Sequence, residues 1–368
     1  MDVFMHTINC MIGIGLLALP HAMAVVGPVV FNIVLAFVAT AAIFSTHMLT
    51  RCLEQHSGNL EDLCGTLCGL RAGRWAMCAV IVFQNVGSVC SYMHIIMTVS
   101  GALLPYVPAQ YTLAMVVLLL IYPVSLPRSS RCLTLVSAAA ITCVMAFVCY
   151  TVYFALVQHV GPFAPWDLFD ERMRVDQCLS IITFAFVCQP TIVTTVNLHS
   201  DKLGSASCAS IGAMALGTVL YVAIAMFGWM VMGPNTPDNM LSVYVDQGGL
   251  GGVVIAVIMC VSVVLTVPAL LLPVLHMTAA VDRSPMQWIS TLMMYVLMYV
   301  LVVFMPSFKI AVVLVGAFAG TLLVFVVPSL MYTWIFRKHN PLAWAMVLVY
   351  AGMGASVTTM SVYDIFQM

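Results

Sequence analysis

Thr-Ile-Asn-Cys-Met-Ile-Gly-Ile-Gly-Leu-Leu-Ala-Leu-Pro, residues 7–20, is the stretch that decides the fold. It lies inside the first apolar run, residues 3–25, which has the length of roughly 20 residues that a bilayer-spanning helix needs. Gly13 and Gly15 flank a single residue there, and Pro20 follows. Lipid offers no partner to an unpaired peptide group, so a break is tolerated only against protein or a watery cavity. The stretch therefore predicts a membrane helix that is broken part of the way across.

The composition of the whole chain agrees with a membrane location. Of its 368 residues, 63% are hydrophobic and only 7% are charged, against roughly 25% charged residues in an average soluble domain. The mean hydropathy is +1.10. These values exclude a water-soluble fold, a disordered chain and a nucleic-acid-binding protein. The apolar runs are about 20 residues long rather than alternating segments of about 10, so we expect an all-α integral membrane protein.

Charged residues, prolines and glycines divide the chain into eleven apolar runs. We expect transmembrane helices over residues 3–25, 29–50, 75–100, 111–126, 132–157, 177–198, 206–232, 251–276, 286–305, 309–334 and 342–363. No cleavable signal peptide is expected, because a basic region before the first run is missing. Between the second and third runs, leucines interleaved with Glu61 and Asp62 predict a short interfacial helix.

The placement of lysine and arginine predicts the orientation. With the N-terminus in the cytoplasm, nine of the twelve fall in inside loops and three in outside loops, as the positive-inside rule favours. The inside set is Arg51, Arg71, Arg74, Arg128, Arg131, Lys202, Arg283, Arg337 and Lys338, and the outside set is Arg172, Arg174 and Lys309. We therefore expect a cytoplasmic N-terminus and an extracytoplasmic C-terminus.

The sixth run, residues 177–198, contains a second break. Its stretch Phe-Ala-Phe-Val-Cys-Gln-Pro ends in Pro190, which removes a backbone donor and crowds the preceding turn. Either break alone is also compatible with ordinary close packing, since Gly and Pro are common in membrane helices. However, the two runs lie five apart and cross in opposite directions, as the broken first helices of two inverted five-helix repeats do. The pattern predicts one polytopic transporter domain, residues 1–368, with repeats over about 3–157 and 177–334 and an extra helix over about 342–363.

Broken helices expose backbone groups near the bilayer midplane. Free amide N–H groups attract a carboxylate, and free carbonyl groups attract a cation. A zwitterionic amino acid together with a small coupling ion has this pair of charges. Such a solute and ion therefore match the partial charges that the two breaks expose.

Several stretches resemble the amino acid/auxin permease family of the amino acid-polyamine-organocation superfamily, including its sodium-coupled neutral amino acid transporters and protozoan permeases. They are similar to its first, third, sixth, eighth and tenth helices, at residues 7–22, 84–92, 184–190, 265–273 and 316–328. The resemblance runs through the chain in the right order. It implies the eleven-helix, five-plus-five inverted-repeat (LeuT-like) fold and amino acid transport by alternating access, driven by sodium or protons. It implies neither an enzyme nor a cofactor beyond the coupling Na⁺ or H⁺.

The resemblance also implies a sodium site between the first and eighth helices. In sodium-coupled relatives an Asn and a hydroxyl residue hold the ion, and Asn9 and Thr266 match them. Ser262 lies one turn before Thr266, and carbonyls freed near Ile12 add further oxygen ligands, which sodium prefers. The alternatives are a helix–helix hydrogen bond for Asn9 and a bond back to its own helix for Thr266.

Proton coupling remains open as a second hypothesis. The usual proton carrier is missing, because no Asp or Glu lies in the middle of a predicted span. His21 and His94 were identified as the titratable groups inside the spans, and histidine titrates near neutral pH. The alternative for each is a local hydrogen bond.

The substrate is expected at both breaks. Its carboxylate should meet amides of the first break, with the Tyr92 hydroxyl as a further donor, and its ammonium group should meet carbonyls of the second. The predicted substrate-binding residues are Gly13, Ile14, Gly15, Leu16, Tyr92, Phe184, Ala185, Val187 and Gln189. Tyr92 is equally compatible with a packing role.

The spans contain no carboxylate to pair with a cationic side chain, so neutral L-amino acids are the expected substrates. Asp364 lies near the end of the last run and Glu171 in a loop. The alternatives are a transporter of cationic amino acids that uses cation–π contacts, or an amino acid sensor on the same scaffold. The expected partners are the amino acid and membrane lipid, not nucleic acid. The plasma membrane is expected in preference to a vacuolar or lysosomal membrane.

Overall fold

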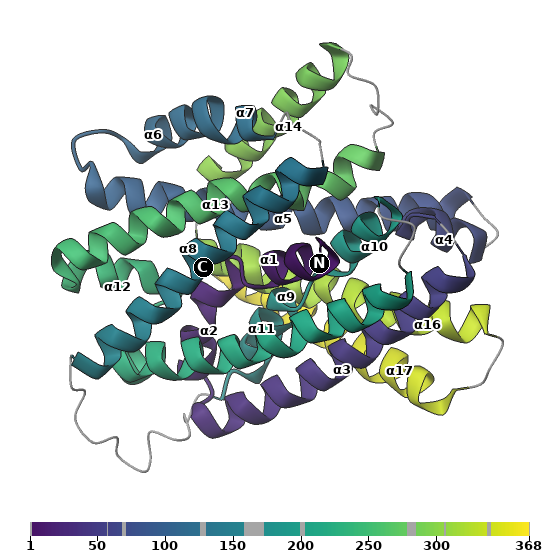
Figure 1. Cartoon of the computed structure of the whole chain (residues 1–368). Helices are drawn as coiled ribbons and strands as arrows, with labels where there is room; N and C mark the ends of the chain where they lie inside the picture. The colour runs from purple at the N-terminus through teal and green to yellow at the C-terminus, as the bar shows by residue number, and fades with distance from the viewer. Residues whose placement is uncertain are drawn as a thin grey trace.

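The computed structural model describes residues 2–56, 58–67, 71–125, 130–157, 173–198, 203–277, 285–304, 307–336 and 340–367. All regular structure in these ranges is helical (Figure 1). By length and composition, eight helices of the described chain can cross a membrane, and the bent pair α1 and α2 makes up to nine. Two further apolar helices, Ala109–Val124 and Trp288–Phe304, are shorter. The chain is therefore an all-helical, multi-pass membrane protein.

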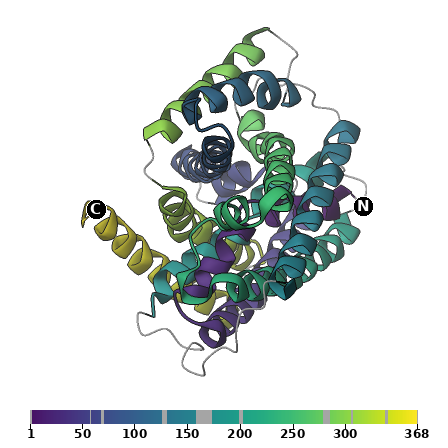
Figure 2. The ribbon, with the colours of Figure 1, turned by 90° about the vertical axis from the view of Figure 1, so that its left-hand side faces the viewer.

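The elements follow the predicted runs closely. In chain order they are α1 (Asp2–Met11), α2 (Gly15–Ala24), α3 (Pro28–Gln55), α4 (Leu60–Leu67), α5 (Arg71–Leu103), α6 (Ala109–Val116), the π-helical η1 (Val117–Ile121), α7 (Tyr122–Val124), α8 (Ser130–Val157), α9 (Val175–Ala185), α10 (Gln189–Leu198), α11 (Leu203–Met232), the 3₁₀ turn η4 (Gly233–Asn235), α12 (Met240–Gln247), α13 (Gly249–Met277), α14 (Pro285–Phe304), α15 (Phe308–Val315), the π-helical η5 (Gly316–Gly320) and η6 (Leu322–Val326), α16 (Val327–Ile335) and α17 (Pro341–Gln367). The long helices run across the view of Figure 1, and many are seen end-on in Figure 2.

Both predicted breaks are present. The first lies at residues 12–14, where α1 and α2 are bent by 45° relative to each other. The second lies at residues 186–188, between α9 and α10. Glycine lowers the cost of leaving the helix at the first break, and Pro190 prevents a regular ladder across the second.

Small residues bring the two broken spans together. A Cβ added to Gly15 would lie 2.9 Å from the Cα of Ala185, so only glycine permits this approach. Gly316 of η5 packs against the Ser180 carbonyl and the Phe184 side chain in the same way. An 18-residue stretch of the second broken span is entirely buried within the protein. Its freed backbone groups therefore face other helices rather than lipid, as the bilayer requires.

Contacts between connecting segments define two ends of the bundle. At one end the Arg174 amide donates to the Val25 carbonyl at 3.2 Å, and His21 Nδ1 lies 2.9 Å from the Thr236 carbonyl oxygen. At the other end Asn197 contacts the segment before α4. Each of these contacts joins two segments that the sequence places on the same side of the membrane. Of the basic residues that predicted the orientation, Arg128, Arg172, Lys202, Arg283, Arg337 and Lys338 lie outside the described residues.

Candidate functional site

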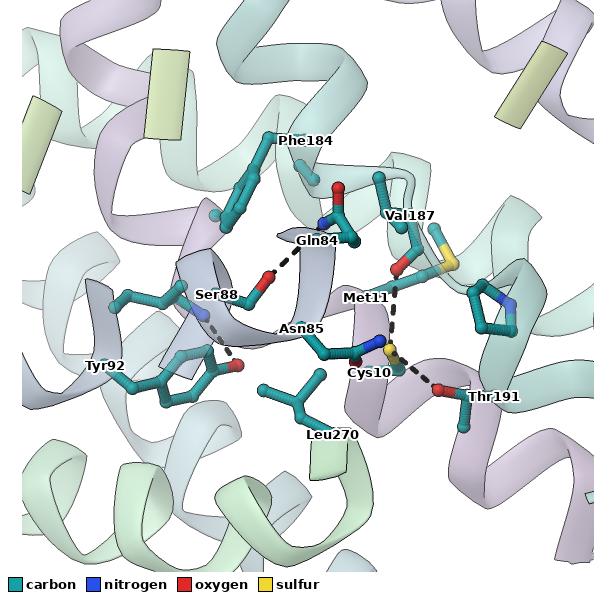
Figure 3. A pocket seen from close by; sticks show the side chains of 14 residues that line it. Cys10, Met11, Gln84, Asn85, Ser88, Tyr92, Phe184, Val187, Thr191 and Leu270 are labelled. Carbon is teal, nitrogen blue, oxygen red and sulfur yellow. Dashed lines mark hydrogen bonds between the residues drawn. The ribbon is translucent and has the colours of Figure 1, made fainter. Parts of the chain in front are cut away.

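A small cavity lies where the two breaks meet (Figure 3). Four broken or continuous spans contribute its walls: α1 with α2, α5, α9 with α10, and α13. The lining residues are Cys10, Met11, Ile14, Gly15, Gln84, Asn85, Ser88, Tyr92, Phe184, Ala185, Val187, Pro190, Thr191 and Leu270. Six of the nine predicted substrate-binding residues are in this set.

The first break presents hydrogen-bond donors. The Ile14 amide donates to the Tyr92 hydroxyl oxygen at 3.1 Å, so the proton of that hydroxyl points elsewhere and has no acceptor among the described residues. The flanking amides of Gly13 and Gly15 are likewise without a hydrogen-bond partner in the described part of the chain. The N-terminus of α2 adds its partial positive charge at this point. Together these groups can bind an anion such as a carboxylate.

The carbonyls of the second break already have partners, each with a second lone pair to spare. The Phe184 carbonyl accepts from the Val187 amide at 3.2 Å, and the Val187 carbonyl accepts from the Cys10 thiol at 3.4 Å. Cys10 Sγ also lies 3.5 Å from Thr191 Oγ1. Figure 3 shows the two Cys10 contacts on the side of the cavity away from Tyr92.

Tyr221 joins the two breaks. Its hydroxyl oxygen lies 2.6 Å from the Met11 carbonyl oxygen and 2.6 Å from that of Ala185. The residue is fully buried in α11. Neither glycine spacing nor proline marks such a residue in the sequence, so the motifs do not predict it.

We expect Tyr221→Phe to destabilise the protein by about 1–3 kcal/mol, because the buried carbonyls at both breaks lose a donor. Thermal unfolding of the purified protein measures this effect. Tyr299→Phe is the matched control, since its hydroxyl donates to the Gln110 carbonyl at an exposed position. Equal melting temperatures for the two variants would contradict a bridging role for Tyr221.

Besides the predicted Tyr92, helix α5 contributes three polar residues to the cavity wall that were not predicted, Gln84, Asn85 and Ser88. Gln84 Nε2 donates to the Ser88 hydroxyl at 3.3 Å, and Asn85 Nδ2 donates to the Ile81 carbonyl at 2.8 Å. Gln84 Oε1 is buried and has no hydrogen-bond partner. The spacing of Gln84, Ser88 and Tyr92, four residues each, places them on one helix face and was the signal that could have found them.

The predicted ion-binding residues largely come together beside the cavity. Thr266 Oγ1 lies 3.2 Å from Asn9 Oδ1 and 2.9 Å from the Ser262 carbonyl oxygen. Asn9 Nδ2 donates to the Ser137 hydroxyl at 3.3 Å, and all four residues are buried. Ile12 begins the break three residues after Asn9. Buried oxygen atoms from three helices are thus gathered where a small cation can be held.

The remaining predicted residues lie around this centre. Gly13 and Leu16 do not line the cavity, although a Cβ on Gly13 would overlap the Tyr92 hydroxyl. Gln189 Oε1 accepts from the Cys188 amide at 3.0 Å and so caps the second break. His21 lies at one end of the bundle rather than at the cavity. The identification of titratable residues within spans omitted His6, whose Nδ1 lies 3.0 Å from the Ser137 hydroxyl oxygen.

An all-helical membrane bundle with an anion-attracting helix break and an adjacent cluster of oxygen atoms belongs to the class of membrane transporters for small charged solutes. Residues 1–367 match the family described as "Transmembrane amino acid transporter protein", so the chain belongs to this family. It is also similar to "Sodium-coupled neutral amino acid symporter 2" of Danio rerio, with 25% identity. The match covers 90% of this chain and 74% of the relative. The protein is an amino acid transporter and not an enzyme.

Proposed function

We propose that the protein carries neutral L-amino acids across the membrane together with sodium, by alternating access around the cavity between the two breaks. The observation that carries this proposal is the character of the cavity. Its walls offer backbone amides and the Tyr92 hydroxyl to a carboxylate, while none of its fourteen lining residues has a charged side chain. A cationic substrate side chain would have no carboxylate to pair with there.

The polar groups favour one orientation of the substrate. Its carboxylate lies at the first break, between the N–H groups of Gly13 and Gly15 and the Tyr92 hydroxyl. Its ammonium group then points toward the carbonyls of Phe184 and Val187 and toward the unpartnered Gln84 Oε1. Each charged end thus meets groups of opposite partial charge, which offsets its loss of water.

The coupling ion lies next to this site in the proposal. Sodium contacts replace the mutual hydrogen bonds of the groups that hold the ion. These groups are Asn9 Oδ1, the Thr266 hydroxyl, Ser262 and the freed carbonyl near Ile12. The printed name of the relative states sodium coupling and neutral amino acids for that protein, which supports the same assignment here. Sodium is preferred over protons because the site consists of neutral oxygen atoms.

At the level of the fold, we propose eleven membrane spans. The nine spans that include the bent pair are joined by the two shorter apolar helices, Ala109–Val124 and Trp288–Phe304. The breaks in the first and sixth spans support the five-plus-five inverted repeat over residues 3–157 and 177–334, with residues 342–363 as an extra helix. The proposal retains a cytoplasmic N-terminus, an extracytoplasmic C-terminus and location in the plasma membrane.

An uptake screen in proteoliposomes tests the substrate assignment. Radiolabelled neutral amino acids should accumulate under an inward sodium gradient, and unlabelled arginine should compete poorly. Preferred accumulation of arginine would refute the neutral assignment. Ligand-dependent thermal stabilisation with no flux of any amino acid would instead identify a sensor.

We expect Tyr92→Phe to raise the substrate concentration for half-maximal uptake about 10- to 100-fold. A hydrogen bond to a charged group contributes roughly 1.5–3 kcal/mol, and about 1.4 kcal/mol corresponds to tenfold in affinity. The control is Tyr295→Phe, which removes a hydroxyl buried against Ser125 away from the cavity. The role of Tyr92 would be refuted by a half-saturation constant equal to that of the control.

A further inference from the structure

A second cavity lies directly beyond the second helix break. It is lined by Asn59, Leu60, Glu61, Ile81, Pro190, Thr194, Pro273 and Met277. Pro190 lines both cavities, so the two adjoin at the start of α10. The second cavity lies toward the end of the bundle that carries the predicted cytoplasmic loops.

One residue that lines this cavity, Glu61, has a carboxylate side chain. The predicted interfacial helix is present as α4, but it packs against α5 and α16, and its Glu61 is only 5% exposed. The neighbouring Asp62 behaves as the pattern predicts, because it forms a 3.2 Å ion pair with Arg74 at the surface. Within the described chain, no Lys or Arg forms an ion pair with Glu61.

The surroundings of Glu61 compensate its charge only in part. Burial raises the pKa of its carboxyl group, and the nearby Asp62 raises it further. A hydrogen bond from its own backbone amide, the charge of Arg74 and the Asn59 side chain lower the pKa in part. From α5 the other titratable neighbour is the Cys78 thiol. The cavity walls from α10 and α13 are formed by uncharged residues, and the described residues of α16 are uncharged too. A buried carboxylate without a paired cation favours its protonated form, and a cation that enters the cavity would stabilise the charged form instead.

Two hydrogen bonds join the end of α10 to the segment before α4. Asn197, at the end of α10, donates through Nδ2 to the Gly58 carbonyl at 2.9 Å and to Asn59 Oδ1 at 3.1 Å. These bonds tie the inner half of the broken sixth span to the segment that leads into Glu61. Asn59 also lines the second cavity, so these contacts lie at its edge.

We propose that Glu61 is a cation-binding residue on the release path, which receives the positively charged group that leaves the substrate cavity. The shared chemistry is a small cation, and its two sources are the coupling sodium ion and the ammonium group of the substrate. The proposal rests on the sodium-coupled transport proposed above. It adds a second, transient cation site with a carboxylate, a group that the first cavity lacks.

The test uses proteoliposomes that contain the full chain in one orientation, with efflux measured from the predicted cytoplasmic side. The wild type must first show sodium-driven uptake, and its absence would refute the proposed function rather than the role of Glu61. Glu61→Gln is then compared with Asp62→Asn, a matched loss of one carboxylate at the surface, and with Glu61→Asp. Efflux is recorded while internal sodium, internal amino acid and internal pH are varied one at a time.

We expect Glu61→Gln to raise one internal half-saturation constant about tenfold and to leave the external constants unchanged. A change in the sodium constant identifies sodium as the cation, and a change in the amino acid constant identifies the ammonium group. Internal acidification should slow release in the wild type, because it neutralises Glu61, and should have no effect on Glu61→Gln. Glu61→Asp should restore part of the affinity. Unchanged internal constants and an unchanged pH profile would overturn the proposal, as would an equal effect of Asp62→Asn.

Discussion

Gly13→Val is expected to abolish amino acid uptake. A Cβ at this position would overlap the Tyr92 hydroxyl and lie 2.9 Å from the ring carbon that bears it. The contact is made by a rigid aromatic ring that is itself buried in α5, so a small shift does not relieve it. Tyr92 must leave its bond to the Ile14 amide, and the carboxylate then loses its hydroxyl donor while the added side chain obstructs the break.

The measurement is substrate-dependent thermal stabilisation of the purified variant together with uptake in proteoliposomes. Both should be undetectable at substrate concentrations that saturate the wild type. Gly352→Val in α17 is the matched control, because a Cβ there meets no atom within 4 Å. Stabilisation and uptake at wild-type substrate concentrations would show that the first break does not hold the carboxylate.

Asn9→Ala is expected to raise the sodium concentration for half-maximal uptake at least about tenfold. The amide oxygen of Asn9 is one of the few buried oxygen atoms that face Thr266, and a contact with a charged group contributes roughly 1.5–3 kcal/mol. The substrate constant at saturating sodium should change much less, because Asn9 does not line the cavity.

Sodium titrations of uptake separate this effect from a general loss of stability. Asn32→Ala is the control, since Asn32 Nδ2 donates to the Pro28 carbonyl of its own helix at 2.8 Å and lies outside the oxygen cluster. The sodium constant of this control should equal that of the wild type. If Asn9→Ala also keeps the wild-type sodium constant, the ion is not held at this cluster.

The two breaks could be predicted from the sequence because their causes are local. Gly13, Gly15 and Pro190 restrict or release the backbone of their own helices, and no partner is needed to see this. The pairing of Asn9 with Thr266 came from family resemblance, since a separation of 257 residues carries no local signal.

The residues that sequence reasoning missed depend on tertiary packing. Tyr221 bridges two carbonyls only because α11 lies beside both breaks. The sequence predicted a short interfacial helix that contains Glu61 and Asp62, but it did not show which of the two is buried. The packing of α4 against α5 directs Glu61 into the second cavity and leaves Asp62 in an ion pair with Arg74. An amphipathic pattern of eight residues does not determine that rotation.

The most direct test of the account is the accumulation of a radiolabelled neutral amino acid in proteoliposomes under a sodium gradient or a proton gradient, imposed separately. The account predicts accumulation above the external concentration under the sodium gradient, and none under the proton gradient alone. It also predicts that Gly13→Val removes this accumulation and that Gly352→Val does not. Accumulation driven by protons without sodium, or no accumulation under either gradient, would contradict a sodium-coupled site at the two helix breaks.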